Sequence, residues 1–207
     1  MNRKMKNQAG FTLIELMVTI AVAIILLGIG IPLFDTMLAN NRAVTQSNTF
    51  VTAMNLARSE AISKNITTTI CSDADGNPAS FVCGDHEDWT NGWFVFNDED
   101  RDGVRDNNEN VIKIWEAMEA DTDILYTASD ASTDGFIRFN SLGEKVGTAV
   151  LSFRMTQVDG SGNITTSSRP RCIYLNAIGQ VRTAQIPNDP GDTVGDKGSA
   201  ASAAICP

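Results

Sequence analysis

The acidic segment from Asp98 to Glu109 is the part of the sequence whose side chains could bind a metal ion. Three aspartates stand at alternate positions, a glycine follows them, and a glutamate closes the segment at its twelfth position. This spacing matches the calcium-binding loop pattern, in which carboxylate oxygens and a backbone carbonyl surround the ion. The predicted calcium ligands are Asp98, Asp100, Asp102, Val104, Asp106 and Glu109.

The flanks of this segment differ from those of an EF-hand. Short β-type runs, Trp93 to Asn97 and Val111 to Trp115, replace the two helices. A β-hairpin can present the same oxygens, because the loop backbone sets the direction of the ligands. The alternative is an acidic hairpin tip that keeps the protein soluble without binding metal.

The four cysteines are Cys71, Cys83, Cys172 and Cys206. They lack paired CxxC spacing and His86 is the only histidine, so the sequence does not indicate a zinc site. In a domain outside the cytoplasm disulfides are the default. Of the three possible sets of pairs, the sequence favours Cys71 with Cys83 and Cys172 with Cys206, because each pair joins near neighbours.

Motifs of enzymes are absent from the sequence. There is no nucleophile elbow, no phosphate loop and no second histidine for a triad, so we expect a protein that is not an enzyme and requires no cofactor. The 207 residues carry 16 basic and 25 acidic side chains, a net charge of -9. This acidity argues against a general nucleic-acid coat protein, since phosphate binding needs clustered Lys and Arg.

The N-terminal segment from Phe11 to Leu33 is a run of 23 residues whose only charge is Glu15. As a helix it would be about 35 Å long, enough to cross a bilayer core of about 30 Å. No small-residue cleavage site closes the run, so we expect it to stay attached. Arg3, Lys4 and Lys6 precede it and favour an orientation with the C-terminal domain outside the cytoplasm. A simple membrane anchor is the alternative.

The residues from Gly10 to Leu16, GFTLIEL, resemble the type IV prepilin signature. The resemblance implies cleavage after Gly10 by prepilin peptidase, N-methylation of the new terminal Phe11, and a helix that leaves the membrane to join a filament. Glu15 would lie about one helical turn from the new α-ammonium group. Its carboxylate could attract that group on a neighbouring subunit and neutralise both charges in an apolar setting.

Helical periodicity continues beyond the apolar run and predicts one long helix from Phe11 to Lys64. Pro32 lies inside it and is expected to kink or loosen it. The apolar stripe from Phe50 to Ile62 is expected to pack on a globular domain.

The residues after Asn65 form short β-type runs separated by Gly, Asp, Asn and Ser, which predicts antiparallel sheets packed against the helix, an α+β fold. The polar stretch from Pro187 to Ala204 is predicted to be a surface loop held by Cys206. The predicted strands are Thr67 to Cys71, Trp93 to Asn97, Val111 to Trp115, Phe136 to Phe139, Val150 to Met155, Arg171 to Leu175 and Gln180 to Ala184.

Several of these segments together resemble the FimT/FimU/GspH group of minor pilins and pseudopilins. They are Asn55 to Ala61, the threonine-rich strand ending at Cys71, Gly92 to Phe96, the acidic loop that follows, and Arg171 to Gly179. The resemblance implies a two-sheet β-domain behind the helix. The expected parts are a leader at 1–10, a transmembrane half of the helix at 11–33, an amphipathic half at 34–64 and a globular domain at 65–207. Arg58 to Ala61 is expected to mark where helix meets sheet, with a solvated helical turn as the alternative.

The function implied by this resemblance is that of a minor pilin, a structural subunit that helps to prime assembly of a type IV pilus for adhesion, twitching motility or DNA uptake. Its partners would be prepilin peptidase, other minor and major pilins, and the inner-membrane assembly platform. Its location would be the inner membrane, with the β-domain in the periplasm, and then the pilus at the cell surface. One alternative is a minor pseudopilin of a type II secretion system.

A DNA receptor of a competence pilus is a further alternative. Members of the group used in DNA uptake carry a Gly-Arg-x-Arg motif near the C-terminus. The matching residues here, Gly179 to Arg182, keep the glycine and the second arginine only. Loss of the first arginine argues against phosphate binding. The candidate DNA contacts are Arg182, Arg171 and Arg169.

Overall fold

The computed structural model describes residues 10–77, 81–85, 88–119, 122–130, 134–158 and 170–185. Contacts divide the chain into two compact units, Met1–Leu38 and Ala39–Pro207. The helix α1 (Leu13–Lys64) passes from the first unit into the second. The predicted long helix is therefore confirmed, with a start at Leu13 in place of Phe11. Position 32 lies within α1, so Pro32 does not interrupt the helix.

The first turn of α1 has its own cap. The hydroxyl of Thr12 accepts a hydrogen bond from the backbone amide of Glu15 at 3.3 Å, which satisfies one of the free amides at the helix N-terminus. The window from Leu13 to Gly30 has a mean hydropathy of 2.6, and none of it is buried within the chain. By length and composition this segment of α1 can span a bilayer core.

The strands of the second unit form two antiparallel four-stranded sheets, as expected for the fold class. The first sheet has the order β3-β2-β1-β5, with β1 (Thr68–Ser72), β2 (Trp93–Asn97), β3 (Val111–Trp115) and β5 (Phe136–Phe139). The second has the order β4-β6-β7-β8, with β4 (Thr122–Ala128), β6 (Leu151–Gln157), β7 (Arg171–Leu175) and β8 (Val181–Gln185). A short 3-10 helix, η1 (Asp88–Asn91), precedes β2.

Most strand predictions are confirmed. The bounds of β2, β3, β5 and β7 are those predicted, and β1, β6 and β8 begin one residue later than predicted. The strand β4 was not predicted from the sequence. Its apolar residues Ile124 to Tyr126 are too few to mark a strand, and only part of the strand is buried.

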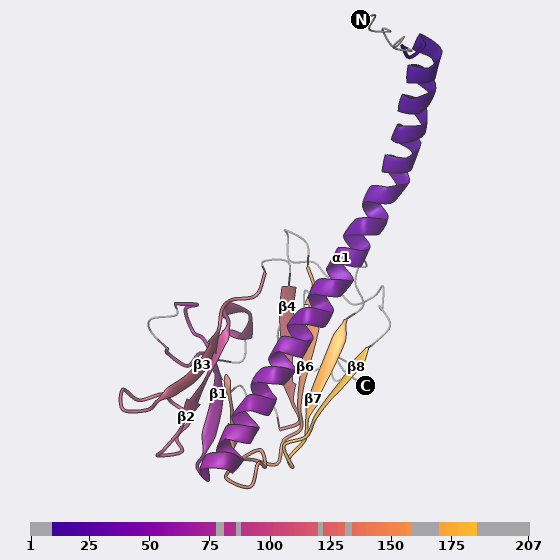
Figure 1. Cartoon of the computed structure of the whole chain (residues 1–207). Helices are drawn as coiled ribbons and strands as arrows, with labels where there is room; N and C mark the ends of the chain where they lie inside the picture. The colour runs from indigo at the N-terminus through magenta and orange to yellow at the C-terminus, as the bar shows by residue number, and fades with distance from the viewer. Residues whose placement is uncertain are drawn as a thin grey trace, which may run out of the picture. The chain divides into compact units, whose positions relative to one another are not determined.

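The C-terminal part of α1 covers the interface between the two sheets. Its fully buried residues recur at intervals of three or four, so one face of the helix enters the core. Figure 1 shows this part of α1 crossing in front of strands from both sheets. Ile62, at the end of the predicted stripe, is 50% exposed. The buried helix residues that form part of the core are Phe50, Ala53, Met54, Ala57 and Ala61.

Phe50 is the centre of the aromatic core. Its ring meets those of Trp89, Trp93 and Phe153 edge to face, with centroids 5.3, 4.9 and 4.9 Å away. Such pairs contribute about 0.5–1.5 kcal/mol each beyond the area they bury. Phe50 thus links α1 to η1, β2 and β6.

One predicted disulfide is confirmed. Cys71 in β1 is bonded to Cys83, with a Cα–Cα distance of 5.4 Å, and closes a loop between them. Cys172 is also disulfide-bonded. Cys206 lies outside the described residues, so the pairing of Cys172 with Cys206 stays a prediction. The candidate DNA contact Arg169 and the predicted surface loop from Pro187 to Ala204 also fall outside the described residues, as does His86.

Candidate functional site

The predicted processing site lies directly before α1. Gly10 and Phe11 are exposed and outside the helix, and the Phe11 side chain is 83% exposed. A Cβ atom added to Gly10 would meet no atom within 4 Å. The described part of the fold therefore does not require glycine at position 10. Glu15 is exposed in the first turn of α1.

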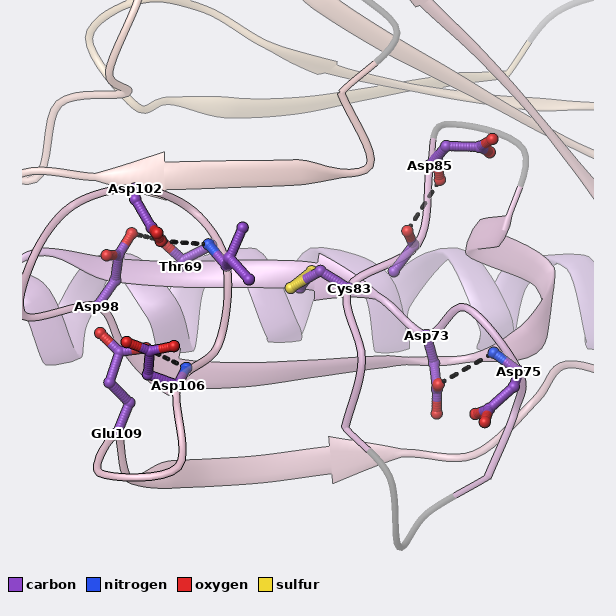
Figure 2. Close-up of a disulfide and its surroundings, with 12 residues drawn as sticks. Thr69, Asp73, Asp75, Cys83, Asp85, Asp98, Asp102, Asp106 and Glu109 are labelled. Carbon is purple, nitrogen blue, oxygen red and sulfur yellow. Dashed lines mark hydrogen bonds between the residues drawn. A yellow bond between two sulfur atoms is a disulfide. The ribbon is translucent and has the colours of Figure 1, made fainter.

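The acidic loop joins β2 to β3 at one edge of the first sheet. The backbone amide of Asn97 donates to the carbonyl of Asn110 at 3.0 Å and closes the base of this hairpin. Figure 2 shows Asp98, Asp102 and Glu109 at one end of the sheet, on the far side of the disulfide from Asp73 and Asp85. The hairpin predicted from the sequence is confirmed.

Asp98 is fully buried at the start of this loop. Its backbone amide donates to the carbonyl of Thr67 at 3.1 Å. Its Oδ2 accepts a hydrogen bond of 2.7 Å from the hydroxyl of Thr69 on β1. Its other oxygen, Oδ1, is buried and has no hydrogen-bond partner. One carboxylate oxygen is therefore withdrawn from water without compensation, which is costly for a charged group.

Asp98, Asp100 and Asp102 form a compact carboxylate cluster. One oxygen from each of the three lies within 4.8 Å of the other two, and Asp100 and Asp102 are exposed. The amide of Val104 donates to Oδ1 of Asp102 at 2.7 Å, and the amide of Asp102 donates to Oδ1 of Asp100 at 3.3 Å. The loop backbone thus holds two of the three carboxylates.

Gly103 determines how the loop folds. Its φ is +83°, a left-handed conformation that favours glycine, and an added Cβ would lie 2.7 Å from the ring of Phe136. Phe136 belongs to β5, so the loop reaches over β1 to the edge strand. A side-chain nitrogen of Arg138, also on β5, donates to the carbonyl of Arg101.

Glu109 closes the loop from its interior, where it is 3% exposed. Its Oε1 accepts from the amide of Glu99 at 2.7 Å and its Oε2 accepts from the amide of Asp106 at 2.9 Å. Burial raises the pKa of Glu109, the amides of Asp106 and Glu99 lower it, and the charges of Asp98 and Asp100 raise it again.

Of the six predicted calcium ligands, the structure groups the carboxylates of Asp98, Asp100 and Asp102 closely enough to share an ion, and this group does not include Val104, Asp106 or Glu109. The binding of calcium stays a prediction. The residues outside the loop that hold it in place were not predicted from the sequence, namely Thr67, Thr69, Phe136 and Arg138. Only the threonine-rich character of β1 was visible in the sequence, and its alignment with the loop depends on strand pairing.

Comparisons with known families agree with this arrangement of an apolar helix before a two-sheet domain. A family described as "Type II transport protein GspH" matches residues 46–179, which is more than half of the chain. The chain belongs to the GspH family. A prokaryotic N-terminal methylation motif matches residues 5–31 and contains the predicted processing site of this family member.

Solved structures with a similar fold include two minor pilin-like proteins. The type IV minor pilin FimU of Pseudomonas aeruginosa is 15% identical, with a TM-score of 0.45, over 77% of this chain and 96% of that one. The minor pseudopilin EpsH from the type 2 secretion system of Vibrio cholerae is 11% identical, with a TM-score of 0.46, over 73% of this chain and 99% of that one. No curated protein gives a significant match to this member of the GspH family.

Arg58 contacts the β-domain in this GspH-family chain. Its Nε donates to the carbonyl of Gly143 at 2.7 Å, and its Nη2 donates to the carbonyl of Ile178 at 3.4 Å. Both carbonyls lie in turns of the β-domain. Of the segment Arg58 to Ala61, which was predicted to mark where helix meets sheet, Arg58 contacts turns of the β-domain and Ala61 is buried in the core, whereas Ser59 is exposed as in the alternative of a solvated turn.

The two described candidate DNA contacts, Arg171 and Arg182, are not brought onto one face. Arg182 of β8 stands opposite Tyr174 of β7, so these two side chains share a face of the sheet. Arg171 lies three residues from Tyr174 on β7, and alternation along the strand directs it to the other face. Arg171 and Arg182 therefore form no common basic patch.

Proposed function

We propose that this chain is a minor pilin, a structural subunit without catalytic activity that helps to prime assembly of a type IV pilus. The proposal is carried by one observation. An exposed Gly10–Phe11 bond directly precedes an apolar helix, and the same helix continues into a compact β-domain. A subunit with this construction can be held in the inner membrane and then packed into a filament.

The sequence of events begins with removal of the leader 1–10 by prepilin peptidase and methylation of Phe11. The helix then remains in the inner membrane with the β-domain in the periplasm, as the cations of the leader favour. The assembly platform and other pilins finally take up the subunit. The methylation motif over residues 5–31 supports this order.

Processing can be tested in the native membrane with Gly10→Val. The unmodified protein should yield a chain that begins at N-methylated Phe11 in mass spectrometry, whereas Gly10→Val should keep its leader. Since a Cβ atom added at position 10 would meet no atom within 4 Å, this variant is chosen to test recognition rather than folding. An intact Met1 in the unmodified protein, or a cut after residue 33, would contradict the proposal.

A minor pseudopilin of a type II secretion system is the second candidate, because the matching family is described by type II transport. Both candidate functions require the helix and the processing site, but one belongs to the type IV pilus and the other to the type II secretion system. Deletion of the gene separates them. Loss of surface pili with normal protein export supports the minor pilin, whereas loss of protein export with normal pili supports the pseudopilin.

A DNA receptor is less well supported, since Arg171 and Arg182 lie on opposite faces of their sheet. We expect gel-shift titration of the full chain in detergent to give weak, salt-sensitive DNA binding. Tight binding that is abolished by Arg182→Ala would favour the receptor over both structural candidates.

A further inference from the structure

We propose that the loop from Asp98 to Glu109 is a calcium site that fastens the β2–β3 hairpin to β1. Calcium binds six to eight oxygen ligands, and this loop offers carboxylates at the first, third, fifth, ninth and twelfth positions. The proposal concerns the β-domain itself and holds for a pilus or a secretion subunit alike.

The buried oxygen of Asp98 is the observation that points beyond an acidic surface loop. An acidic tip that serves solubility would keep its carboxylates in water, as Asp100 and Asp102 do. Asp98 is instead fully buried, with one oxygen fixed by Thr69 and the other without a partner. A cation in the loop would supply the missing partner for Oδ1.

The spacing of the three aspartates fits a calcium ion. Two oxygens bound to the same calcium can be at most about 4.6–5.2 Å apart, twice the usual calcium–oxygen distance. One oxygen from each of Asp98, Asp100 and Asp102 lies within 4.8 Å of the other two, which is compatible with a shared calcium ion. Magnesium needs a stricter octahedron and usually keeps several of its waters, so a loop that offers this many carboxylates favours calcium.

Two arginines near the loop contact groups other than its carboxylates. Arg138 donates to the carbonyl of Arg101 and stacks on Phe136, and Arg105 approaches the carbonyl of Glu109 and the ring of Phe81. Within the described part of the chain, no Lys or Arg forms an ion pair with the carboxylates of the loop. The repulsion between the carboxylates of the loop is therefore not neutralised by a basic side chain, and a bound cation would reduce it.

The loop is organised before an ion arrives. Gly103 gives the turn at the sixth position, and Glu109 is already held in the interior by the amides of Glu99 and Asp106. Carboxylate oxygens can accept a hydrogen bond and bind metal at the same time, because each has two lone pairs. We assign Asp98, Asp100, Asp102, the carbonyl of Val104, Asp106 and Glu109 as the ligands.

The test uses the full chain in a non-ionic detergent and calcium chloride as the only added ligand. Binding is measured by isothermal titration, and thermal unfolding is followed by tryptophan fluorescence in millimolar calcium or in chelator. We expect a dissociation constant on the order of 10⁻⁴ to 10⁻³ M and a higher melting temperature in calcium. Amide hydrogen exchange between Glu99 and Asn108 should slow when calcium is added.

Asp100→Asn is the decisive variant, because Asp100 is exposed and asparagine can still accept the hydrogen bond from Asp102. It should weaken calcium binding by at least about tenfold. Glu116→Gln is the matched control, since it removes one exposed negative charge just beyond β3 and should bind calcium as the unmodified chain does. Asp98→Asn should also lose binding.

Three results would overturn the calcium site. The first is an unmodified chain that melts at the same temperature in calcium and in chelator. The second is a calcium effect of equal size in Asp100→Asn, which would indicate general charge screening. The third is equal stabilisation by millimolar magnesium, which would remove the selectivity for calcium.

Discussion

The Nε of Arg58 lies 2.7 Å from the carbonyl oxygen of Gly143, and this contact joins the helix to the turn after β5. The same guanidinium reaches the carbonyl of Ile178, in the turn between β7 and β8. One side chain of α1 therefore holds turns that follow strands of both sheets. A planar group with several fixed donors suits this role better than a lysine would.

Replacing Arg58 by alanine should destabilise the β-domain. Two carbonyls would lose their charged donor, and a hydrogen bond to a charged group typically contributes about 1.5–3 kcal/mol to stability. Arg42→Ala is the control on the same helix, because its exposed ion pair with Glu119 should contribute less than about 1 kcal/mol. Urea unfolding of the full chain in detergent measures both. Equal losses of unfolding free energy in the two variants would show that the Arg58 contacts stabilise the domain no more than the exposed ion pair does.

The turn that Arg58 holds depends on Gly179. Its φ is +75°, and an added Cβ would lie 2.1 Å from the carbonyl oxygen of Gly143. Gly179→Ala should therefore push apart the two turns that Arg58 joins and lower the melting temperature strongly.

Gly147→Ala is the matched control for this clash. Gly147 has a similar φ of +89°, but its added Cβ would meet only the Lys145 ammonium nitrogen, at 3.4 Å. It should cost about 1–2 kcal/mol from backbone strain alone. If the two alanine variants melt at the same temperature, the contact between the turns does not limit stability.

The parts of the fold that could be predicted from the sequence are those with strong local patterns. The long apolar run and its periodic continuation predicted α1, and aromatic and β-branched runs predicted seven strands. β4 was missed because its apolar core, Ile124 to Tyr126, is short and its burial is incomplete. Its place as a strand is decided by its pairing with β6, which no local pattern reveals.

The candidate site also has features that the sequence predicts and features that depend on strand pairing. The spacing from Asp98 to Glu109 was visible in the sequence because all the expected ligands lie in one loop. The burial of Asp98 could not be predicted, since it follows from the neighbouring residue Thr69 on β1 and thus from the register of β1 with β2. The contact of Gly103 with Phe136 depends likewise on the pairing of β1 with β5.

Glu15→Ala tests the role of the carboxylate in the apolar part of α1. Membrane insertion should persist or become easier, because a charge inside a bilayer costs about 2.5–3.5 kcal/mol on insertion scales. Incorporation into filaments should fall, since the α-ammonium group of a neighbouring subunit would lose its partner. Fractionation of membranes and sheared filaments measures both steps, with Glu116→Gln as the control. Normal incorporation of Glu15→Ala would show that Glu15 does not guide docking.

Asp73 provides a test of pH dependence in the β-domain. It is 4% exposed next to the Cys71–Cys83 disulfide, and its carboxylate accepts a hydrogen bond from the amide of Asp75 at 3.4 Å. Burial raises the pKa of Asp73 above its unfolded value of about 3.9, and the nearby charge of Asp75 adds to this. The folded state therefore binds the proton more tightly than the unfolded state does.

The sign of the effect follows from that difference. Below the unfolded pKa, Asp73 is protonated in both the folded and the unfolded state, so its burial carries no cost of charge. The free energy of unfolding then falls as the pH rises through the folded pKa, because the folded state must bury an ionised carboxylate. Asp73→Asn removes the buried charge and keeps an oxygen for the amide of Asp75, so it should be more stable than the unmodified chain at neutral pH. The advantage should shrink as the pH falls toward about 4. Urea unfolding of both chains across this range isolates Asp73, because they share every other titrating group. A difference that stays constant with pH, or a variant that is less stable throughout, would contradict the raised pKa.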